Sequence, residues 1–540
     1  MTSSNKASSV AHLKEAHRQH AAGGDLRRAE AAYRQALQAD PMSAEAAAGL
    51  ADLLRDVGRL GEALAITHRL AARTPADYGV LAAHGQTLRA LGRSDDALVF
   101  YRRAAAENPK SAVAAHNLAG LYGDRFQFKE AEQFARKALS SGLDSPETWL
   151  VLARALQGLG QLDLSESAFY EALSRNPRHA EAQRDLAQLI WMKTGDVNEA
   201  IKPLDIALAA GGPDPRLMEM RAIALKFCGD ADAAREAIEH AVQAFPNDAA
   251  IRVAAAHLAI LTGDAAHGLA QARAGALIAP ASIWTRLCVC EALLALGEAA
   301  TAAILIEELR AAAPLDQNII AYQATAWRML GDARYQALHD YDALVGEMVL
   351  DTPKGWSSLE GYLADLTAAL ESRHVFRTHP FQQSLLHGSQ ISGLEASEDP
   401  VIRAFFEAVR APIQRRLAAL GRGGDPLRAR NTGKSRFEGV WSVRLQGGGG
   451  RHTDHVHHKG WLSSACYIDL PAGVTGSPTR EGWLKFGEPG IATRPALPPE
   501  HFVEPKAGHL VLFPSYMWHG TQAFSGQGAR LSIAFDLLPA

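Results

Sequence analysis

Four histidines and one aspartate fall within seven consecutive positions of the stretch RHTDHVHHKGW, residues 451–461. Imidazole and carboxylate groups are common ligands of first-row metals. When two histidines and one carboxylate bind such a metal on one face, the remaining coordination positions stay open for a substrate and for oxygen. The stretch therefore predicts a metal site that supports oxidation.

One short extended segment can supply only two of the ligands, because alternate side chains point to the same side of a strand. Two pairs meet this condition, His452 with Asp454 and His455 with His457. The third ligand must come from elsewhere, and His519 is the candidate, because it follows an apolar run and the turn-like segment FPSYMW. The spacing alone leaves both pairs open.

Two polar residues further along could bind a carboxylate. Arg530 follows His519 after ten intervening residues, and Ser532 lies two positions later, on the same face of an extended segment. A guanidinium can form a bidentate pair with a carboxylate, and a serine adds a hydroxyl donor. A metal beside such an anchor implies a dicarboxylate cosubstrate.

Short runs typical of β-strands carry these residues from about position 436 onward. They are GVWSVRL, WLSSACYIDLP, GWLKFGE, GHLVLFPS and ARLSIAFDLLP. Two helices are predicted before them, SSLEGYLADLTAALESR and DPVIRAFFEAVRAPIQRRLAALG. Such strands without interleaved helices predict an antiparallel sandwich or jelly roll. The histidine cluster lies between the first two runs, where it would reach the mouth between the sheets.

A helical repeat fills the first three fifths of the chain. Prolines after helical runs recur with a spacing of 34 residues, at Pro41, Pro75 and Pro109 and again at Pro246, Pro280 and Pro314. The pattern resembles the tetratricopeptide repeat, with small residues where two helices must approach closely: Gly49, Gly85, Ala63, Ala97 and Ala131. This resemblance implies an all-α solenoid over residues 8–333, whose concave surface usually holds a peptide or protein. A second domain is expected over 334–540.

The second domain resembles a known enzyme family. His519, the interval to Arg530 and Ser532 beyond it are similar to the iron(II)- and 2-oxoglutarate-dependent dioxygenases of double-stranded β-helix fold. The runs HVHHKGWLSSACYIDLP, HPFQQSLLHGSQ and GHLVLFPSYMWHGT resemble in particular the 2-oxoglutarate oxygenases that are fused to tetratricopeptide arrays in bacteria. The resemblance covers roughly residues 340–540 and implies Fe(II), 2-oxoglutarate and O2 as cofactor and cosubstrates.

The same resemblance implies a role for each matching residue. His519 corresponds to the distal iron ligand, and Arg530 to the residue that pairs with the far carboxylate of 2-oxoglutarate. Ser532 and Tyr467 correspond to supporting contacts with that carboxylate. His379, in THPFQQS, is a further candidate near the mouth, with capping or core packing as its alternative role.

For the proximal ligands the family offers both patterns. Many members use His-X-Asp, which His452 and Asp454 satisfy, whereas the closer relatives have His-X-His before Gly-Trp, which His455 and His457 match. We favour His455 and His457 with His519 as the metal ligands. The alternative is that His452 and Asp454 are the proximal ligands. If His455 and His457 are the ligands, Asp454 could instead support them without binding the metal.

The composition is that of a globular protein. Of 540 residues, 47% are apolar and 21% are charged, and the formal net charge of −4 gives no reason to expect a nucleic acid or an anionic membrane as partner. No apolar run is long enough to cross a bilayer, and the first residues lack the apolar core of a signal peptide, so we expect a cytoplasmic protein. The four cysteines are scattered, which argues against a disulfide framework.

Three functions remain open at this level. The first is a dioxygenase that hydroxylates a protein or peptide recruited by the solenoid. The second is a tetratricopeptide scaffold whose oxygenase-like domain binds a ligand without catalysis. The third is an oxygenase acting on a small molecule or glycan, with the solenoid serving assembly, for example as a homo-oligomer. The intact set His455, His519 and Arg530 favours an enzyme.

Overall fold

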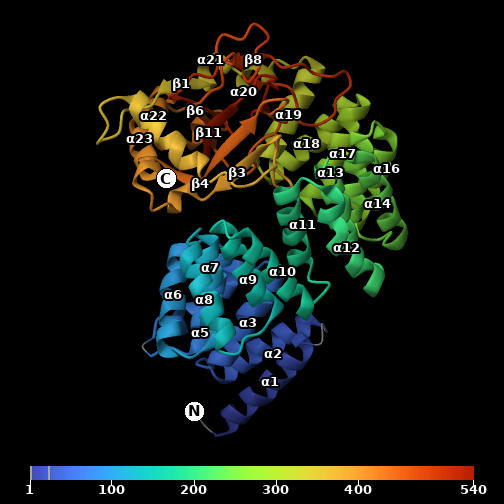
Figure 1. Cartoon of the computed structure of the whole chain (residues 1–540). Helices are drawn as coiled ribbons and strands as arrows, with labels where there is room; N and C mark the ends of the chain where they lie inside the picture. The colour runs from blue at the N-terminus through green and yellow to red at the C-terminus, as the bar shows by residue number, and fades with distance from the viewer. Residues whose placement is uncertain (1–2, 22–24, 74) are drawn as a thin grey trace. The chain divides into compact units, whose positions relative to one another are not determined.

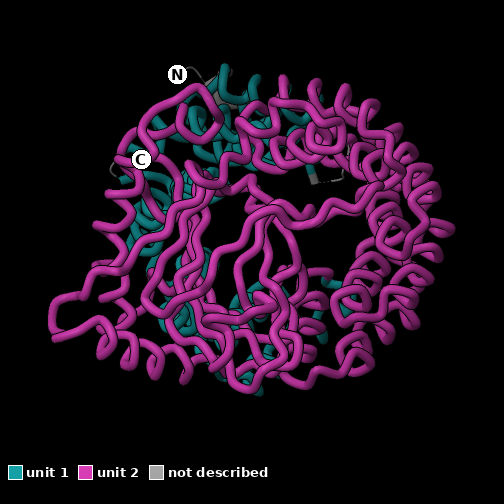
Figure 2. Tube along the Cα trace, turned by 90° about the horizontal axis from the view of Figure 1, so that it is seen from above, with its two compact units in different colours: residues 1–179 teal, residues 180–540 magenta. Residues whose placement is uncertain are grey.

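The computed structural model describes residues 3–21, 25–73 and 75–540. The chain forms two compact units, residues 1–179 and residues 180–540, which are coloured separately in Figure 2. Within the described ranges, none of the helices combines the length and the apolar character that crossing a bilayer requires.

The first unit is built from helices that pack against their neighbours in sequence, as labelled in Figure 1. They are α1 (Ser3–Ala21), α2 (Leu26–Ala39), α3 (Ala44–Asp56), α4 (Leu60–Ala71), α5 (Tyr78–Ala90), α6 (Ser94–Glu107), α7 (Ala112–Asp124), α8 (Phe128–Ser140), α9 (Pro146–Gly158) and α10 (Leu162–Arg175). The small residues lie where helices approach closely. A Cβ atom on Gly49 would come within 2.6 Å of the Tyr33 ring, and one on Gly85 within 2.6 Å of the Tyr101 ring.

A residue with positive φ marks the turn inside each repeat from α3 onward. These residues are Gly58, Gly92, Phe126, Gly160, Gly195, Gly229, Gly263, Gly297 and Gly331, so the period of 34 continues, with a single step of 35, where the prolines become irregular. Glycine adopts this left-handed conformation without a steric penalty. Phe126 is the exception, with a φ of 57°. The turns thus confirm a tetratricopeptide-like solenoid.

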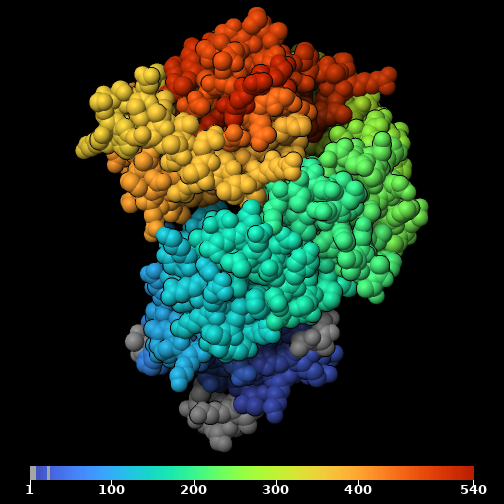
Figure 3. Space-filling model, viewed as in Figure 1, coloured from blue at the N-terminus to red at the C-terminus, as the bar shows by residue number. Residues whose placement is uncertain are grey.

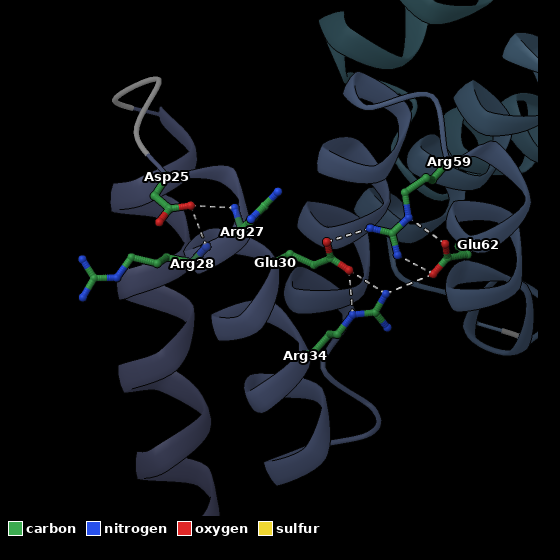
Figure 4. Close-up of polar contacts among 7 residues, drawn as sticks. All are labelled: Asp25, Arg27, Arg28, Glu30, Arg34, Arg59 and Glu62. Carbon is green, nitrogen blue, oxygen red and sulfur yellow. Dashed lines mark hydrogen bonds and ion pairs between the residues drawn. The ribbon is translucent and has the colours of Figure 1, made fainter. Parts of the chain in front are cut away.

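Ion pairs join neighbouring repeats in the first unit, as Figure 4 shows. Glu30 on α2 accepts hydrogen bonds from Arg34 on the same helix and from Arg59, which precedes α4. Glu62 on α4 accepts from the same two arginines. The two arginines and Glu62 are 40–49% exposed and Glu30 is 20% exposed, so the network contributes modestly and is weakened by salt.

The second unit begins with the remaining helices of the solenoid. They are α11 (Ala180–Thr194), α12 (Val197–Gly211), α13 (Pro215–Phe227), α14 (Ala231–Ala244), α15 (Ala249–Leu261), α16 (Ala265–Ile278), α17 (Ile283–Leu296), α18 (Ala299–Ala312) and α19 (Gln317–Leu330). An ion pair links two of them, because Nε2 of His257 on α15 lies 3.3 Å from the Glu291 carboxylate on α17. Tyr322 on α19 donates a hydrogen bond to the same carboxylate, at 2.9 Å.

This ion pair should make stability depend on pH. Burial disfavours a charged His257, but Glu291 outweighs that effect and raises the pKa of His257 to about 10, above its unfolded value of about 6.5. The pair therefore stabilises fully below about pH 6.5, and its contribution is lost as the pH rises through the folded pKa of His257. We expect Glu291→Gln to lower the melting temperature more at about pH 6 than at about pH 9.

Thermal denaturation of wild type and variant at both pH values measures this difference. Glu298→Gln, at an exposed position before α18, is the matched control and should show no such trend. A gap between wild type and Glu291→Gln that stays constant with pH would mean that His257 is not protonated in the folded protein.

The rest of the second unit is rich in strands. Its helices are α20 (Arg334–Leu338), α21 (Tyr341–Leu344), α22 (Leu359–Glu371) and α23 (Pro400–Leu420), with 3-10 turns η1 (Leu394–Ala396) and η2 (Arg428–Arg430). Its strands are β1 (Gly346–Val349), β2 (Leu385–Leu386), β3 (Gly388–Ser392), β4 (Ser435–Gln446), β5 (Arg451–His452), β6 (Leu462–Asp469), β7 (Leu484–Phe486), β8 (His501–Val503), β9 (His509–Pro514), β10 (His519–Thr521) and β11 (Ala529–Pro539). Both predicted helices and all five predicted strand runs are present.

The strands form two layers. The larger sheet has the order β1-β9-β6-β11-β4-β3 with antiparallel neighbours, and the shorter strands form the sheet β10-β7-β8 and the pair β2-β5. The rings of Phe486 on β7 and Phe513 on β9 pack at 5.0 Å between the layers. On β11, Phe535 contacts Phe405 of α23, so alternate residues such as Arg530 face the second layer. This is the jelly-roll architecture that the sequence predicts.

The strand-rich region packs against the last solenoid helices. Figure 3 shows its surface, orange to red, meeting that of the green helices of the same unit. Near α11 and α13, the backbone N–H of Phe381 donates to Oε1 of Gln188, and His379 bonds the carbonyl of Phe227. Near α17 and α19, Arg494 donates to the carbonyl of Leu294 and Arg328 pairs with Glu500. The predicted domain boundary between residues 333 and 334 stays a prediction.

Candidate metal and carboxylate site

Three histidines converge between the two layers. His455, His457 and His519 each offer a ring nitrogen, and these nitrogens lie within 4.8 Å of one another. The Nε2 atoms of His455 and His457 are 3.0 Å apart. The backbone fixes this arrangement, because His455 and His519 exchange N–H to carbonyl hydrogen bonds of 2.9 and 3.1 Å.

Each of the three imidazoles is oriented through Nδ1. His455 bonds the carbonyl of Thr453 at 2.8 Å, and His519 bonds that of Met517 at 2.9 Å. His457 bonds the carboxylate of Asp536 on β11 at 2.7 Å. Because these partners are acceptors, Nδ1 donates to them and Nε2 of each ring is left as an acceptor, which in His455 lies 3.2 Å from the Ser384 hydroxyl. Two lone pairs 3.0 Å apart repel each other, and a shared cation removes that repulsion.

The surroundings of His455 and His519 favour the neutral form, which is the form that binds metals. Burial, assisted by neighbouring His457, lowers the pKa of His455 to about 3. Burial, assisted by the other histidines, also holds the pKa of His519 well below its usual range. The three rings, with their converging Nε2 atoms, therefore fit a divalent first-row metal.

Asp536 was not anticipated from the sequence. It lies on the same face of β11 as Arg530 and Ser532, and it also accepts a hydrogen bond from the Ser463 hydroxyl at 2.7 Å. A carboxylate that binds the outer nitrogen of a metal-bound histidine fixes the ring and strengthens it as a ligand. Asp536 has that relation to His457.

We expect Asp536→Asn to weaken metal binding by about 10-fold to 100-fold, the range that such outer partners contribute. The amide keeps the shape of the side chain but loses its charge. Metal titration by calorimetry under anaerobic conditions measures the effect. Glu438→Gln on β4, which replaces a carboxylate paired with Arg436 at the surface, should leave the affinity unchanged. Equal affinities for wild type and Asp536→Asn would show that Asp536 does not support the site.

His452 and Asp454 are not among the residues whose ligand atoms converge, although the ring of His452 stacks on that of His455 with centroids 5.9 Å apart. Asp454 accepts from Lys485 Nζ at 2.8 Å, and its other oxygen has no hydrogen-bond partner. Burial raises the pKa of Asp454, and Lys485 opposes that shift. His452 bonds the Ser384 hydroxyl at 3.0 Å through Nδ1, and the same hydroxyl lies 3.2 Å from Nε2 of His455. Lys485 and Ser384 had no recognisable signal in the sequence.

The three residues expected to bind a carboxylate share one buried surface. Arg530, Ser532 and Tyr467 are 2%, 5% and 0% exposed, and Ser532 pairs with Tyr467 across the sheet. Nε of Arg530 and the Tyr467 hydroxyl have no hydrogen-bond partner. Burial lowers the pKa of Arg530, as expected for a charge without a counterion. Together these donors fit a bound carboxylate.

Arg530 is also close to the histidines. After burial and His455, its charge contributes to holding the pKa of His452 well below the usual range. Arg530 also lies on the same face of β11 as Asp536, which bonds His457, so the carboxylate anchor and the histidine cluster face the same interior.

His379, the further candidate from the sequence, lies outside the histidine cluster. His379 packs on Trp191 of α11, so its role is structural. Trp461 is buried and donates to the carbonyl of Leu427, and His458 is exposed. The ring of Trp441 lies 5.6 Å from that of His457, and the ring of Phe513 lies 4.5 Å from that of His519.

Family models match both parts of the chain. Residues 439–536 match the family described as "Putative 2OG-Fe(II) oxygenase", and residues 5–121 and 150–215 match tetratricopeptide repeat families. This chain joins tetratricopeptide repeats to a domain of that oxygenase family. The oxygenase match runs from β4 to Asp536 and includes all three histidines and Arg530. The family implies Fe(II), 2-oxoglutarate and O2, and the histidine cluster could bind the iron.

Solved structures resemble the helical part. A tetratricopeptide repeat protein from Parabacteroides merdae ATCC 43184 is 23% identical, with 44% of this chain and 93% of that chain covered and a TM-score of 0.36. The anaphase-promoting complex APC/C hetero-tetramer Cut9-Hcn1 is 17% identical, with 50% and 52% covered and a TM-score of 0.33. MamA protein is 20% identical, with 32% and 94% covered and a TM-score of 0.27. Comparison with curated proteins gives no match.

Proposed function

We propose that this protein is an iron(II)- and 2-oxoglutarate-dependent dioxygenase that hydroxylates a protein or peptide recruited by its tetratricopeptide array. The observation that carries the proposal is the convergence of three Nε2 lone pairs beside a buried arginine without a counterion. Neither feature stabilises the protein by itself, and a metal with a dicarboxylate ligand would satisfy both.

Each side chain has a distinct part in the proposed reaction. His455, His457 and His519 would hold the iron, with Asp536 fixing the ring of His457. Arg530 and the Tyr467 hydroxyl would bind the far carboxylate of 2-oxoglutarate, with Ser532 beside them. When bound, iron with O2 and 2-oxoglutarate supplies the oxidising power, and 2-oxoglutarate leaves as succinate and carbon dioxide. The surrounding sheets exclude water from the reacting groups.

The array supports a macromolecular substrate. Tetratricopeptide repeats generally mediate protein interactions, and a stacked helical array offers an extended concave surface. A small-molecule oxygenase would have little use for the long array of helices α1–α19 that this chain carries.

The test is succinate formation from 2-oxoglutarate by the full-length protein with Fe(II) and ascorbate in air. We expect 2-oxoglutarate to be converted slowly to succinate even without the primary substrate, and this conversion should require iron. Peptide libraries incubated under the same conditions would then be searched by mass spectrometry for the gain of one oxygen atom. No succinate, together with no iron-dependent binding of 2-oxoglutarate in calorimetry, would refute the enzyme and leave a binding scaffold.

A further inference from the structure

The distal histidine is attached to the solenoid through its neighbour in sequence. Trp518 immediately precedes His519, and its indole N–H donates to the Thr325 hydroxyl on α19 at 2.9 Å. Thr325 is 2% exposed and uses its own proton to bond the carbonyl of Ala321, also at 2.9 Å. The ring of Trp518 packs against Tyr322, with centroids 6.1 Å apart. This anchor holds the backbone from which His519 projects.

The proximal histidines are attached to the opposite end of the same helical segment. Arg377 and Phe381 donate their backbone N–H groups to α11, to the carbonyl of Met192 and to Gln188. Three residues after Phe381, Ser384 accepts the N–H of Thr453 and places its hydroxyl 3.2 Å from Nε2 of His455. Figure 2 shows the helices of this unit following an arc, with the strand-rich region between its ends.

We infer that the solenoid helices α11 and α19 position the metal ligands. This part of the repeat array would then help to form the metal centre as well as offer a surface for the substrate. This inference rests on the proposed function. Thr325 is a positioning residue, because it acts on His519 through Trp518 and the backbone between them. The Nδ1 bond of His519 goes to the carbonyl of Met517, on the other side of Trp518, so the same anchor also sets the ring orientation.

The alternative is that these contacts only tether two folded parts. In that case, loss of the Trp518 hydrogen bond would lower stability and leave the metal site unchanged. Under our inference it would also loosen His519, and the metal affinity would fall. The two cases differ in a quantity other than stability, so a matched set of variants separates them.

The experiment compares full-length wild type with Thr325→Val, which removes the hydroxyl at nearly constant volume. We expect Thr325→Val to bind Fe(II) about 10-fold more weakly in anaerobic calorimetry, within the range for residues that support metal ligands. Thr325→Ser keeps the hydroxyl and should restore the affinity. Trp518→Phe should behave as Thr325→Val does, and the double variant should be no weaker than Trp518→Phe alone, because both changes remove one hydrogen bond.

The control is Thr285→Val on α17. Thr285 is 1% exposed, and its hydroxyl bonds only the nearby carbonyls of Ala279 and Ser282. The variant Thr285→Val should lower the melting temperature without changing the Fe(II) affinity. If Thr325→Val and Trp518→Phe are likewise less stable but bind Fe(II) as tightly as the wild type does, the inference is wrong and the proposed function stands. If the wild type binds no Fe(II), the proposed function fails, and this inference with it.

Discussion

His519→Ala should reduce metal affinity and iron-dependent succinate formation by more than about 100-fold, beyond the loss expected for a residue that merely supports a ligand. The reason is geometric. His519 is the one member of the cluster that comes from β10, and without it two nitrogens 3.0 Å apart on a single segment would have to hold the metal alone. Calorimetry with Fe(II) and a succinate assay measure the two effects.

The control for this variant is His458→Ala. His458 belongs to the same histidine-rich stretch but is exposed and lies outside the cluster, so its loss should change neither quantity. The comparison separates a defined site from adventitious binding by a histidine-rich loop. Turnover of His519→Ala at the wild-type rate, in a folded protein, would exclude these three histidines as the catalytic metal site.

Arg530→Met should have two effects of opposite sign. The affinity for 2-oxoglutarate should fall by about 100-fold or more, because a pair of hydrogen bonds to a charged group contributes roughly 3 kcal/mol. The protein without cosubstrate should become more stable, because a buried charge that lies over the Tyr467 ring and has no carboxylate partner is replaced by an apolar side chain of similar length. Titration with 2-oxoglutarate and chemical denaturation of the apoprotein measure the two changes.

The opposite signs make this a demanding test. An arginine that mainly stabilised the fold would give a less stable variant. Arg436→Met, which removes an exposed arginine from β4, is the matched control and should leave the cosubstrate affinity unchanged. A stabilised apoprotein that still binds 2-oxoglutarate normally would show that another group holds the far carboxylate.

The regular features of the fold could be predicted from the sequence. The turns and small residues of the repeat recur locally, and long alternating runs such as the one that forms β11 are recognisable without neighbours. The short strands could not be predicted in this way. The sequence predicts no strand for the run that contains β1, yet this run forms the edge of the larger sheet beside β9. Its four residues become a strand through pairing with a distant segment, which no local pattern reports.

In the site, too, some residues could be predicted from the sequence and others could not. Alternation predicts His455 and His457 as one pair, but it permits His452 with Asp454 equally well. Which pair lies beside His519 depends on contacts across the fold, such as the ion pair between Asp454 and Lys485. For Asp536 a signal did exist. It continues the polar positions 530 and 532 on one face of an otherwise apolar strand, and that face lines the interior.

The division of the helices between two units has a consequence for how such a protein can evolve. Helices α11–α19 share a compact unit with the oxygenase domain. The first of them bonds a segment that contacts His455, and the last bonds the residue before His519. Repeats in this part cannot be added or deleted without moving the histidines. Residues 1–179 form their own unit, so repeats there can be gained, lost or resurfaced while the metal centre stays intact. New binding specificities would therefore arise first in residues 1–179, while the reaction at the metal centre stays the same.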